Sequence, residues 1–271
     1  MRMVTGEKDM ERKLIFFDID GTLTSARRFG HVYESTRKAL AMLKENGHFL
    51  ALATGRAAFR ARQFQQEINI LNMVCEGGNE IIIDGRSVSY ELPDQQVFHA
   101  IYEAAMKRGV GVAIAPDDSF YRVSPNDRFH AYAGDFSRFM EVRVDPSLRI
   151  EAIPAIRRLF LSGEQAVLQE IIVSCPLQGI GVMHYERDQF IILEPDDKYK
   201  GIRRMVELLG EDERQVVVFG DGLNDRQMFR DAPFAIAMGN AIPQLKELAD
   251  YVCPSADEDG IYRACQHFGW I

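Results

Sequence analysis

The chain has 271 residues, of which 46% are hydrophobic, and it carries a formal net charge of −8. This length and composition are typical of about two globular domains with ample apolar residues for a core. The negative charge disfavours a nucleic-acid or anionic-membrane partner, and no apolar run approaches the roughly 20 residues of a membrane helix.

Residues 1–12 show no signal-peptide pattern, and we expect them to form a loose N-terminal tail. The four cysteines are widely spaced and show no metal or disulfide pattern. Because reduced thiols are typical of the cytoplasm, the sequence predicts a cytoplasmic protein.

The first predicted strand covers the apolar residues 14–17, which is typical of a buried strand in a parallel sheet. It runs into Asp18, Asp20 and Gly21. Because open α/β sheets bind ligands at the carboxyl ends of their strands, two carboxylates there favour nucleophilic, metal or proton-transfer chemistry. An Asp-Gly turn that only caps a helix is the alternative.

A helix over 33–46 and a second buried strand over 48–53 follow. This strand runs into Thr54-Gly55-Arg56, and a further helix is predicted over 57–67. A hydroxyl and free backbone amides at a helix N-terminus are suited to hold an oxyanion or phosphate. A plain helix cap at Thr54 is the competing interpretation.

A short third strand is predicted next, and Asp84-Gly85 indicates a hairpin. From residue 86 to residue 189, short strands alternate with two or three helices, which predicts an inserted α+β domain. The helices are expected at 94–108, 127–139 and 164–174, and the strands at 110–115, 119–123, 156–161 and 179–184.

The doubly wound pattern returns at residue 190, with a helix over 200–209 and a strand over 215–219. A second acidic turn follows, and an insertion explains why the two acidic turns lie about 200 residues apart. The predicted divisions are a tail at 1–12, a core at 13–85 and 190–271, and an inserted domain at 86–189.

Four polar turns can be taken together: Asp18-x-Asp20-Gly-Thr, Thr54-Gly55-Arg56, Lys200-Gly201 and Gly220-Asp221-Gly222-x-Asn224-Asp225. In this order they resemble the haloacid dehalogenase superfamily of aspartate-nucleophile phosphotransferases. The inserted domain resembles the IIB cap of the Cof-type subfamily. The resemblance covers the chain from Lys13 to its end, and it implies a Rossmann-like, doubly wound, mostly parallel core with an inserted α+β cap of type C2B.

The resemblance implies a phosphatase with Asp18 as the nucleophile, which would form an aspartyl phosphate. Asp20 would protonate the leaving oxygen and then take a proton from water, as suits a carboxyl whose pKa is raised by nearby negative charge. Mg²⁺ would be bound by Asp18, the backbone carbonyl of Asp20, and Asp221.

The same resemblance implies the groups that hold the phosphoryl oxygens, namely Thr54, the amide of Gly55 and Lys200. Asn224 would contact the phosphate or orient Asp221. Asp225 would orient Lys200 or a metal-bound water. Lys198 is a second candidate for the cation, but Lys200 directly precedes Gly201, as in the family pattern, and is therefore favoured.

The chain departs from the family pattern after the third strand, where Gly77-Gly78 replaces the usual Asn-Gly. The side-chain contact expected there is absent or moved to Asn79. The segment 257–260 resembles the closing loop of the family, with a simple helix cap as the alternative.

The expected function is therefore Mg²⁺-dependent hydrolysis of a small phosphorylated metabolite, such as a sugar phosphate or a phosphorylated cofactor, by a monomer or homodimer. A phosphotransferase or mutase and a non-catalytic phosphometabolite sensor are the alternatives, and the retained nucleophile disfavours the sensor. Four charged residues of the inserted domain are candidates to contact the leaving group, with a simple solvated position as the alternative for each. They are Asp117, Asp118, Arg122 and Arg187.

Overall fold

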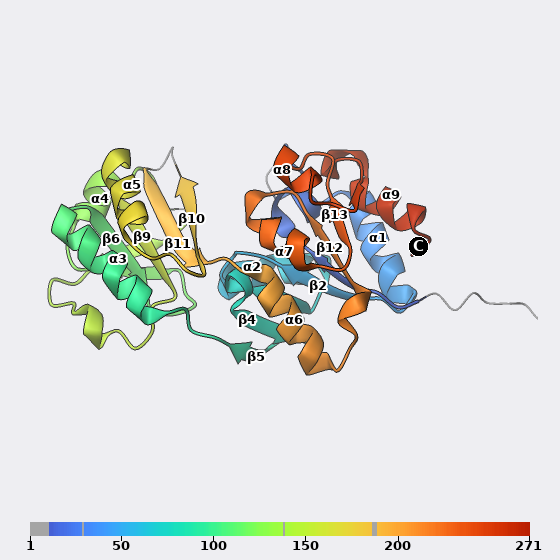
Figure 1. Cartoon of the computed structure of the whole chain (residues 1–271), viewed down its shortest axis with the longest axis horizontal. Coiled ribbons are helices and arrows are strands. Elements are labelled where there is room, and N and C mark those ends of the chain that lie inside the picture. Colours follow the sequence, from blue (N-terminus) through green and yellow to red (C-terminus); the bar gives the residue numbers. More distant parts are fainter. Residues whose placement is uncertain (1–10, 29, 138, 186–188) are drawn as a thin grey trace, which may run out of the picture.

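The computed structural model describes residues 11–28, 30–137, 139–185 and 189–271. Its two β-sheets lie in separate lobes (Figure 1). The larger sheet has the strand order β14-β13-β12-β1-β2-β3-β4-β5, and the smaller sheet has the order β10-β11-β9-β6-β7-β8. The predicted fold class, a doubly wound core with an inserted α+β domain, is confirmed.

Six strands of the larger sheet pair with one another in parallel. The remaining two form the antiparallel hairpin that Asp84-Gly85 predicts, because both turn residues have positive φ. The strands are β1 (Leu14–Phe17), β2 (Phe49–Ala53), β3 (Asn72–Cys75), β4 (Glu80–Ile83), β5 (Arg86–Tyr90), β12 (Val216–Gly220), β13 (Ala235–Ala237) and β14 (Tyr251–Val252).

Helices cover both faces of this sheet, which explains why its central strands are apolar throughout. Ile15 and Phe17 pack toward one face, and Leu14 and Phe16 toward the other. The first face carries α1 (Glu34–Glu45), α2 (Ala58–Ile68) and α9 (Gly260–His267), and the second carries α6 (Lys198–Leu209), α7 (Arg226–Asp231) and α8 (Pro243–Lys246).

The smaller sheet is covered on one face by two helices and carries an aromatic cluster on the other. Its strands are β6 (Gly111–Ala115), β7 (Tyr121–Ser124), β8 (Glu141–Val144), β9 (Arg158–Ser162), β10 (Ile180–Tyr185) and β11 (Phe190–Pro195). The covering helices are α3 (Gln95–Arg108) and α5 (Gln165–Ser174), and α4 (Arg128–Tyr132) packs on the aromatic side. None of the helices in the described ranges is long and apolar enough to cross a membrane.

At each predicted domain boundary, the strand that follows the boundary belongs to the same sheet as the segment that precedes it. Strand β5 pairs with β4 in the larger sheet, because the tight hairpin sends residues 86–90 back along it. Strand β11 pairs with β9 and β10 in the smaller sheet, so the chain returns to the larger lobe only after residue 195. Sheet membership therefore moves the junctions from 85/86 and 189/190 to residues 91–94 and 196–197.

Candidate active site

The first acidic turn leaves β1 at the edge where the parallel strands end. Asp18 is almost fully buried, whereas the Asp20 side chain is half exposed. Gly21 has a φ of +84°, and a Cβ there would lie 2.3 Å from Oδ2 of Asp221. Only glycine therefore lets the turn pack against the second acidic turn.

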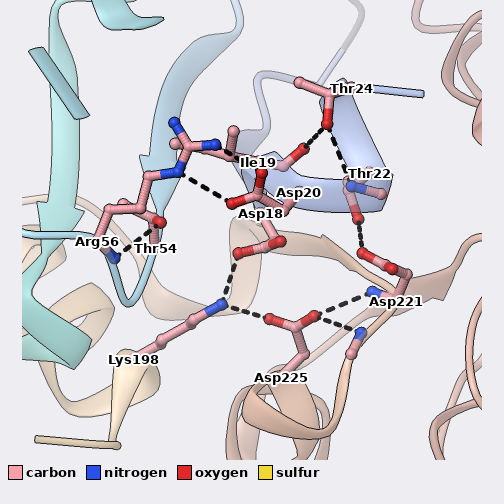
Figure 2. Close-up of polar contacts among 12 residues, drawn as sticks. Asp18, Ile19, Asp20, Thr22, Thr24, Thr54, Arg56, Lys198, Asp221 and Asp225 are labelled. Carbon is pink, nitrogen blue, oxygen red and sulfur yellow. Dashed lines mark hydrogen bonds and ion pairs between the residues drawn. The ribbon is translucent and has the colours of Figure 1, made fainter. Parts of the chain in front are cut away.

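A single buried lysine joins the carboxylates of the two turns (Figure 2). Lys198 Nζ lies 2.6 Å from Oδ1 of Asp18 and 2.6 Å from Oδ1 of Asp225. These two carboxylates raise the pKa of Lys198 and keep the ammonium charged despite its burial. Burial raises the pKa of Asp18, and the charge of Lys198 opposes this rise.

The predicted cation, Lys200, is not at this site. Helix α6 begins at Lys198, capped by Asp197, whose side chain accepts a hydrogen bond from the Lys200 amide. Residues two positions apart point about 200° apart around a helix, so only one of the two lysines faces the carboxylates. The Lys200 side chain is 44% exposed, and its Nζ lies 3.0 Å from Oε1 of Glu91. The lysine assignment from the sequence was therefore wrong by two residues.

Asp225 uses both of its carboxylate oxygens within the protein. Oδ1 accepts from Lys198, and Oδ2 accepts from the amides of Asp221 and Gly222 at 2.9 Å and 3.0 Å. The side chain is fully buried. This geometry fixes the lysine and the second acidic turn, and it leaves Asp225 poorly suited to bind a metal directly.

Asp221 is the carboxylate that faces the first turn. Its Oδ1 accepts a hydrogen bond of 2.8 Å from the Thr22 hydroxyl (Figure 2). Burial raises its pKa to about 6, although the Thr22 hydrogen bond opposes the shift. Asp18, Asp221 and Asp225 each offer a carboxylate oxygen, and these atoms lie within 4.8 Å of one another. Because hard cations prefer oxygen ligands, the donor set of Asp18 and Asp221 fits Mg²⁺.

The turn after β2 supplies the remaining polar groups. Thr54 is buried, and its Oγ1 accepts a hydrogen bond from the Arg56 amide. Arg56 Nε and Nη2 donate to the two oxygens of Asp20 at 2.9 Å and 2.5 Å (Figure 2). A Cβ on Gly55 would lie 3.8 Å from Nδ2 of Asn224. The structure therefore brings the second and fourth predicted turns together.

The Gly77-Gly78 pair has a packing role. A Cβ on Gly77 would lie 1.7 Å from the carbonyl oxygen of Pro195, and one on Gly78 would lie 1.9 Å from that of Asp197. The two glycines therefore admit the chain segment that leads into α6 and places Lys198. Asn79 lines a hollow of about 230 Å³ together with Lys200 and Glu91.

Sequence reasoning did not assign three residues that orient the site. Thr22 and Arg56 stood in the quoted motifs, but the contact each makes depends on a distant turn. Asn240 donates to the Gly21 carbonyl at 2.8 Å and accepts from the Ala256 amide at 2.9 Å. No spacing in the sequence links it to the first turn.

The segment 257–260 is more than a helix cap. Asp257 accepts hydrogen bonds from the Tyr33 hydroxyl, at 3.0 Å, and from the Ser25 hydroxyl. The side chain of Asp259, at the start of α9, makes no capping hydrogen bond. The segment therefore ties the C-terminal part of the chain to the loop that follows the first acidic turn.

The four charged residues proposed in the inserted domain differ in position. Asp118 Oδ1 accepts from the Phe59 amide at 3.0 Å, at the start of α2 in the other lobe. Arg122 is 3% exposed, whereas Asp117 is exposed. Arg187 lies outside the described residues. One of these side chains therefore contacts the core directly, and one is buried.

Comparison with known proteins gives matches over nearly the whole chain. The sequence model of haloacid dehalogenase-like hydrolases matches residues 15–265. YkrA of Bacillus subtilis (strain 168) is 30% identical over 263 residues, covering 97% of this chain and 100% of YkrA. The phosphoglycolate phosphatase of Archaeoglobus fulgidus is 29% identical over 262 residues, covering 96% and 98% of the two chains. The structure of the HAD subclass IIB sugar phosphatase BT4131 has a TM-score of 0.74 and 27% identity, covering 96% and 100%.

Proposed function

The chain belongs to the family of haloacid dehalogenase-like hydrolases, and from this premise we propose that it is a Mg²⁺-dependent phosphatase of small phosphorylated metabolites. The family match confirms the resemblance indicated by the four turns. One observation carries the proposal: the buried Asp18 carboxylate lies at the carboxyl end of β1 and is held by Lys198. A carboxylate fixed at this edge of a parallel sheet is suited to attack a phosphoryl group.

Asp18 would act as the nucleophile in two steps. In the first step, one of its oxygens bonds to phosphorus, the bond from phosphorus to the ester oxygen breaks, and Asp20 gives that oxygen a proton. In the second step, Asp20 takes a proton from water, the water oxygen bonds to phosphorus, and the aspartyl phosphate breaks to release phosphate. The Asp20 carboxyl is half exposed, but Arg56 binds both of its oxygens, so Asp20 would release Arg56 when it exchanges a proton with the leaving oxygen or with water.

The phosphoryl oxygens carry the charge that the site must stabilise. Thr54, the amide of Gly55 and Asn224 would contact them, with Lys198 in the place first assigned to Lys200. Asp225 supports this arrangement because it accepts a second hydrogen bond from the Lys198 ammonium, beside the one to Asp18. The donors are fixed before a substrate arrives, which is the condition for effective electrostatic catalysis.

Mg²⁺ would be held by the carboxylates of Asp18 and Asp221 and by the backbone carbonyl of Asp20. When bound, the ion offsets the repulsion between a carboxylate and an anionic phosphate. Thr22 and Asn240 would keep Asp221 in place, since one donates to its carboxylate and the other lies 3.5 Å from it.

The domain built on the smaller sheet would act as a cap that selects the leaving group. The names of two relatives, a phosphoglycolate phosphatase and a sugar phosphatase, support a small phosphorylated metabolite as the substrate. A sugar phosphate or a phosphorylated cofactor fits this class. A cytoplasmic location and a monomeric or dimeric state stay predictions.

Phosphate release from a panel of sugar, nucleotide and cofactor phosphates tests the proposal. We expect release with Mg²⁺, none with EDTA, and none from the Asp18→Asn variant. Release only after addition of an alcohol acceptor, with the phosphoryl group found on that acceptor, would instead indicate a phosphotransferase. Binding of phosphate esters without any turnover would indicate a sensor.

A further inference from the structure

One face of the smaller sheet carries a row of charged side chains. Ala115 of β6 pairs with Arg158 of β9. Continuing the register of the neighbouring antiparallel strands by one residue places Arg122 of β7 opposite Ala115, and Glu194 of β11 opposite Arg158. Residues opposite one another in a sheet point to the same face. Arg122, Arg158 and Glu194 therefore share one face, on the opposite side from α3 and α5.

This row lies against the phosphate-binding turn proposed above. Arg158 Nη2 donates to the Gly55 carbonyl at 2.7 Å. A Cβ on Gly55 would lie 3.5 Å from Oε1 of Glu194. The end of the row formed by Arg158 and Glu194 therefore borders the space where the part of a substrate beyond its phosphate must lie, and Arg122 lies two strands further along the same face.

Most cations at this junction already have carboxylate partners. Arg158 Nε lies 2.9 Å from Oε2 of Glu194, and its Nη2 lies 3.3 Å from Oε2 of Glu76. Arg157 Nη1 lies 3.3 Å from Oε2 of Glu80 and 3.6 Å from Oε1 of Glu76. Neither arginine needs a ligand to balance its charge.

Arg122 differs, because it makes no ion pair within the described part of the chain. Its Nη1 donates to the carbonyls of Ser119 and Tyr121 at 2.6 Å and 2.7 Å, and its guanidinium lies 5.1 Å from the centre of the Phe160 ring. Its buried Nε has no hydrogen-bond partner among the described residues. Burial and the nearby Arg158 lower its pKa to about 10.

A buried cation without an anionic partner is costly, and an incoming anion would remove that cost. We propose, resting on the phosphatase function above, that Arg122 binds a second anionic group on the leaving-group side of the substrate. The substrates would then be phosphomonoesters that carry a carboxylate or a second phosphate. Planar guanidinium groups bind both anions through paired hydrogen bonds.

Matched esters that differ in one charge test this directly. 3-Phosphoglycerate and glycerol 3-phosphate differ by a carboxylate in place of a hydroxymethyl group, and fructose 1,6-bisphosphate and fructose 6-phosphate differ by the second phosphate. We expect kcat/KM to be at least about tenfold higher for the more charged ester of one pair than for its partner. The pair that shows this preference identifies the recognised group as a carboxylate or as a second phosphate. Arg122→Gln should remove that preference, and Arg122→Lys should keep part of it.

The control is Arg143→Gln, which alters an exposed arginine of β8 paired with Glu141 and should leave the preference intact. Equal kcat/KM for both members of each pair in the wild-type protein would overturn the inference alone. An equal loss on charged and neutral esters in Arg122→Lys would do the same, by indicating a purely structural arginine. Absence of release from every ester, the neutral ones included, would overturn the phosphatase proposal and this inference with it. Should Arg122→Gln fail to fold, the wild-type preference and Arg122→Lys decide.

Discussion

The molecule holds two buried ionic clusters that differ in how they are built. In the core cluster, Lys198 lies between Asp18 and Asp225, and all three side chains belong to the lobe built on the larger sheet. In the junction cluster, Arg157 and Arg158 of the smaller sheet meet Glu76 of the larger one. The first cluster lies within one lobe, whereas the second joins the two lobes.

This difference assigns the two clusters to different tasks, the core cluster to phosphoryl transfer and the junction cluster to substrate capture. The core cluster cannot change without repacking the sheet that carries it, so its charges stand ready before a substrate binds. The junction cluster depends on the relative position of two sheets, so a movement of the cap would break it. We therefore expect changes in the core cluster to affect turnover and changes in the junction cluster to affect substrate capture.

The most severe test of the core cluster is Asp18→Asn. The amide has the shape of the carboxylate but cannot form the aspartyl phosphate, so we expect kcat to fall by at least about 10³-fold. Circular dichroism should show an unchanged fold. Phosphate-release assays measure the loss, and substantial activity in this variant would remove Asp18 from the nucleophile role.

Lys198→Met separates the two candidate lysines. It leaves two buried carboxylates without their cation, so we expect a loss of about 3–5 kcal/mol in the free energy of unfolding. We also expect kcat to fall by about 10²-fold or more. Urea unfolding and steady-state kinetics measure the two effects.

Lys200→Met is the matched control, since it removes an exposed pair with Glu91. It should change the free energy of unfolding by less than about 1 kcal/mol and leave kcat unchanged. A larger loss of turnover in Lys200→Met than in Lys198→Met would reverse the assignment made from the structure.

The same contrast explains what the sequence could predict. Buried parallel strands are uninterrupted apolar runs, so β1, β2 and β12 can be predicted from the sequence, together with the polar turn that follows each of them. The lysine was misplaced because the start of α6 was set two residues late, and a shift of that size turns a helix to its other face. The start is set by the local cap that the Asp197 side chain provides and by the non-local packing of Gly77 and Gly78 against residues 195–197.

The inserted domain was less predictable for a related reason. Strand membership depends largely on distant pairing. The Asp84-Gly85 turn does indicate the hairpin that holds β5 in the larger sheet, but β11 carries no local sign of the sheet to which it belongs. Strand β8 was not predicted, because only one of its four residues is buried. The pairing of Arg158 with Glu76 and Glu194 requires two sheets to be placed together, and no motif spacing reports this.

The pH dependence of metal binding sharpens the description of the core cluster. Burial raises the pKa of Asp221 to about 6, so the carboxyl is increasingly protonated as the pH falls below that value. A proton then competes with Mg²⁺. Because burial also raises the pKa of Asp18, to about 8, the apparent Mg²⁺ affinity should begin to fall below about pH 8 and should fall by at least about tenfold per pH unit below 6. Mg²⁺ titrations of phosphate release between pH 5 and 8 measure this.

Thr22→Val is the informative variant for that titration. It removes the hydrogen bond that lowers the pKa of Asp221, so the decline in Mg²⁺ affinity should begin at a higher pH. An apparent affinity independent of pH in both proteins would show that Asp221 does not titrate with metal binding.

The smallest expected effect concerns the junction cluster. Glu76→Gln keeps the shape of the side chain but removes its charge, while Arg157 retains Glu80 and Arg158 retains Glu194. We expect KM to rise about threefold to fivefold with little change in kcat, as for a loss of about 1 kcal/mol, because each arginine keeps a second carboxylate and no buried charge is left unpaired. Glu207→Gln, which alters an exposed pair with Arg204 on α6, is the control. A fall in kcat as large as that of Lys198→Met would mean that the junction cluster takes part in the chemistry, and the division between the two clusters would not hold.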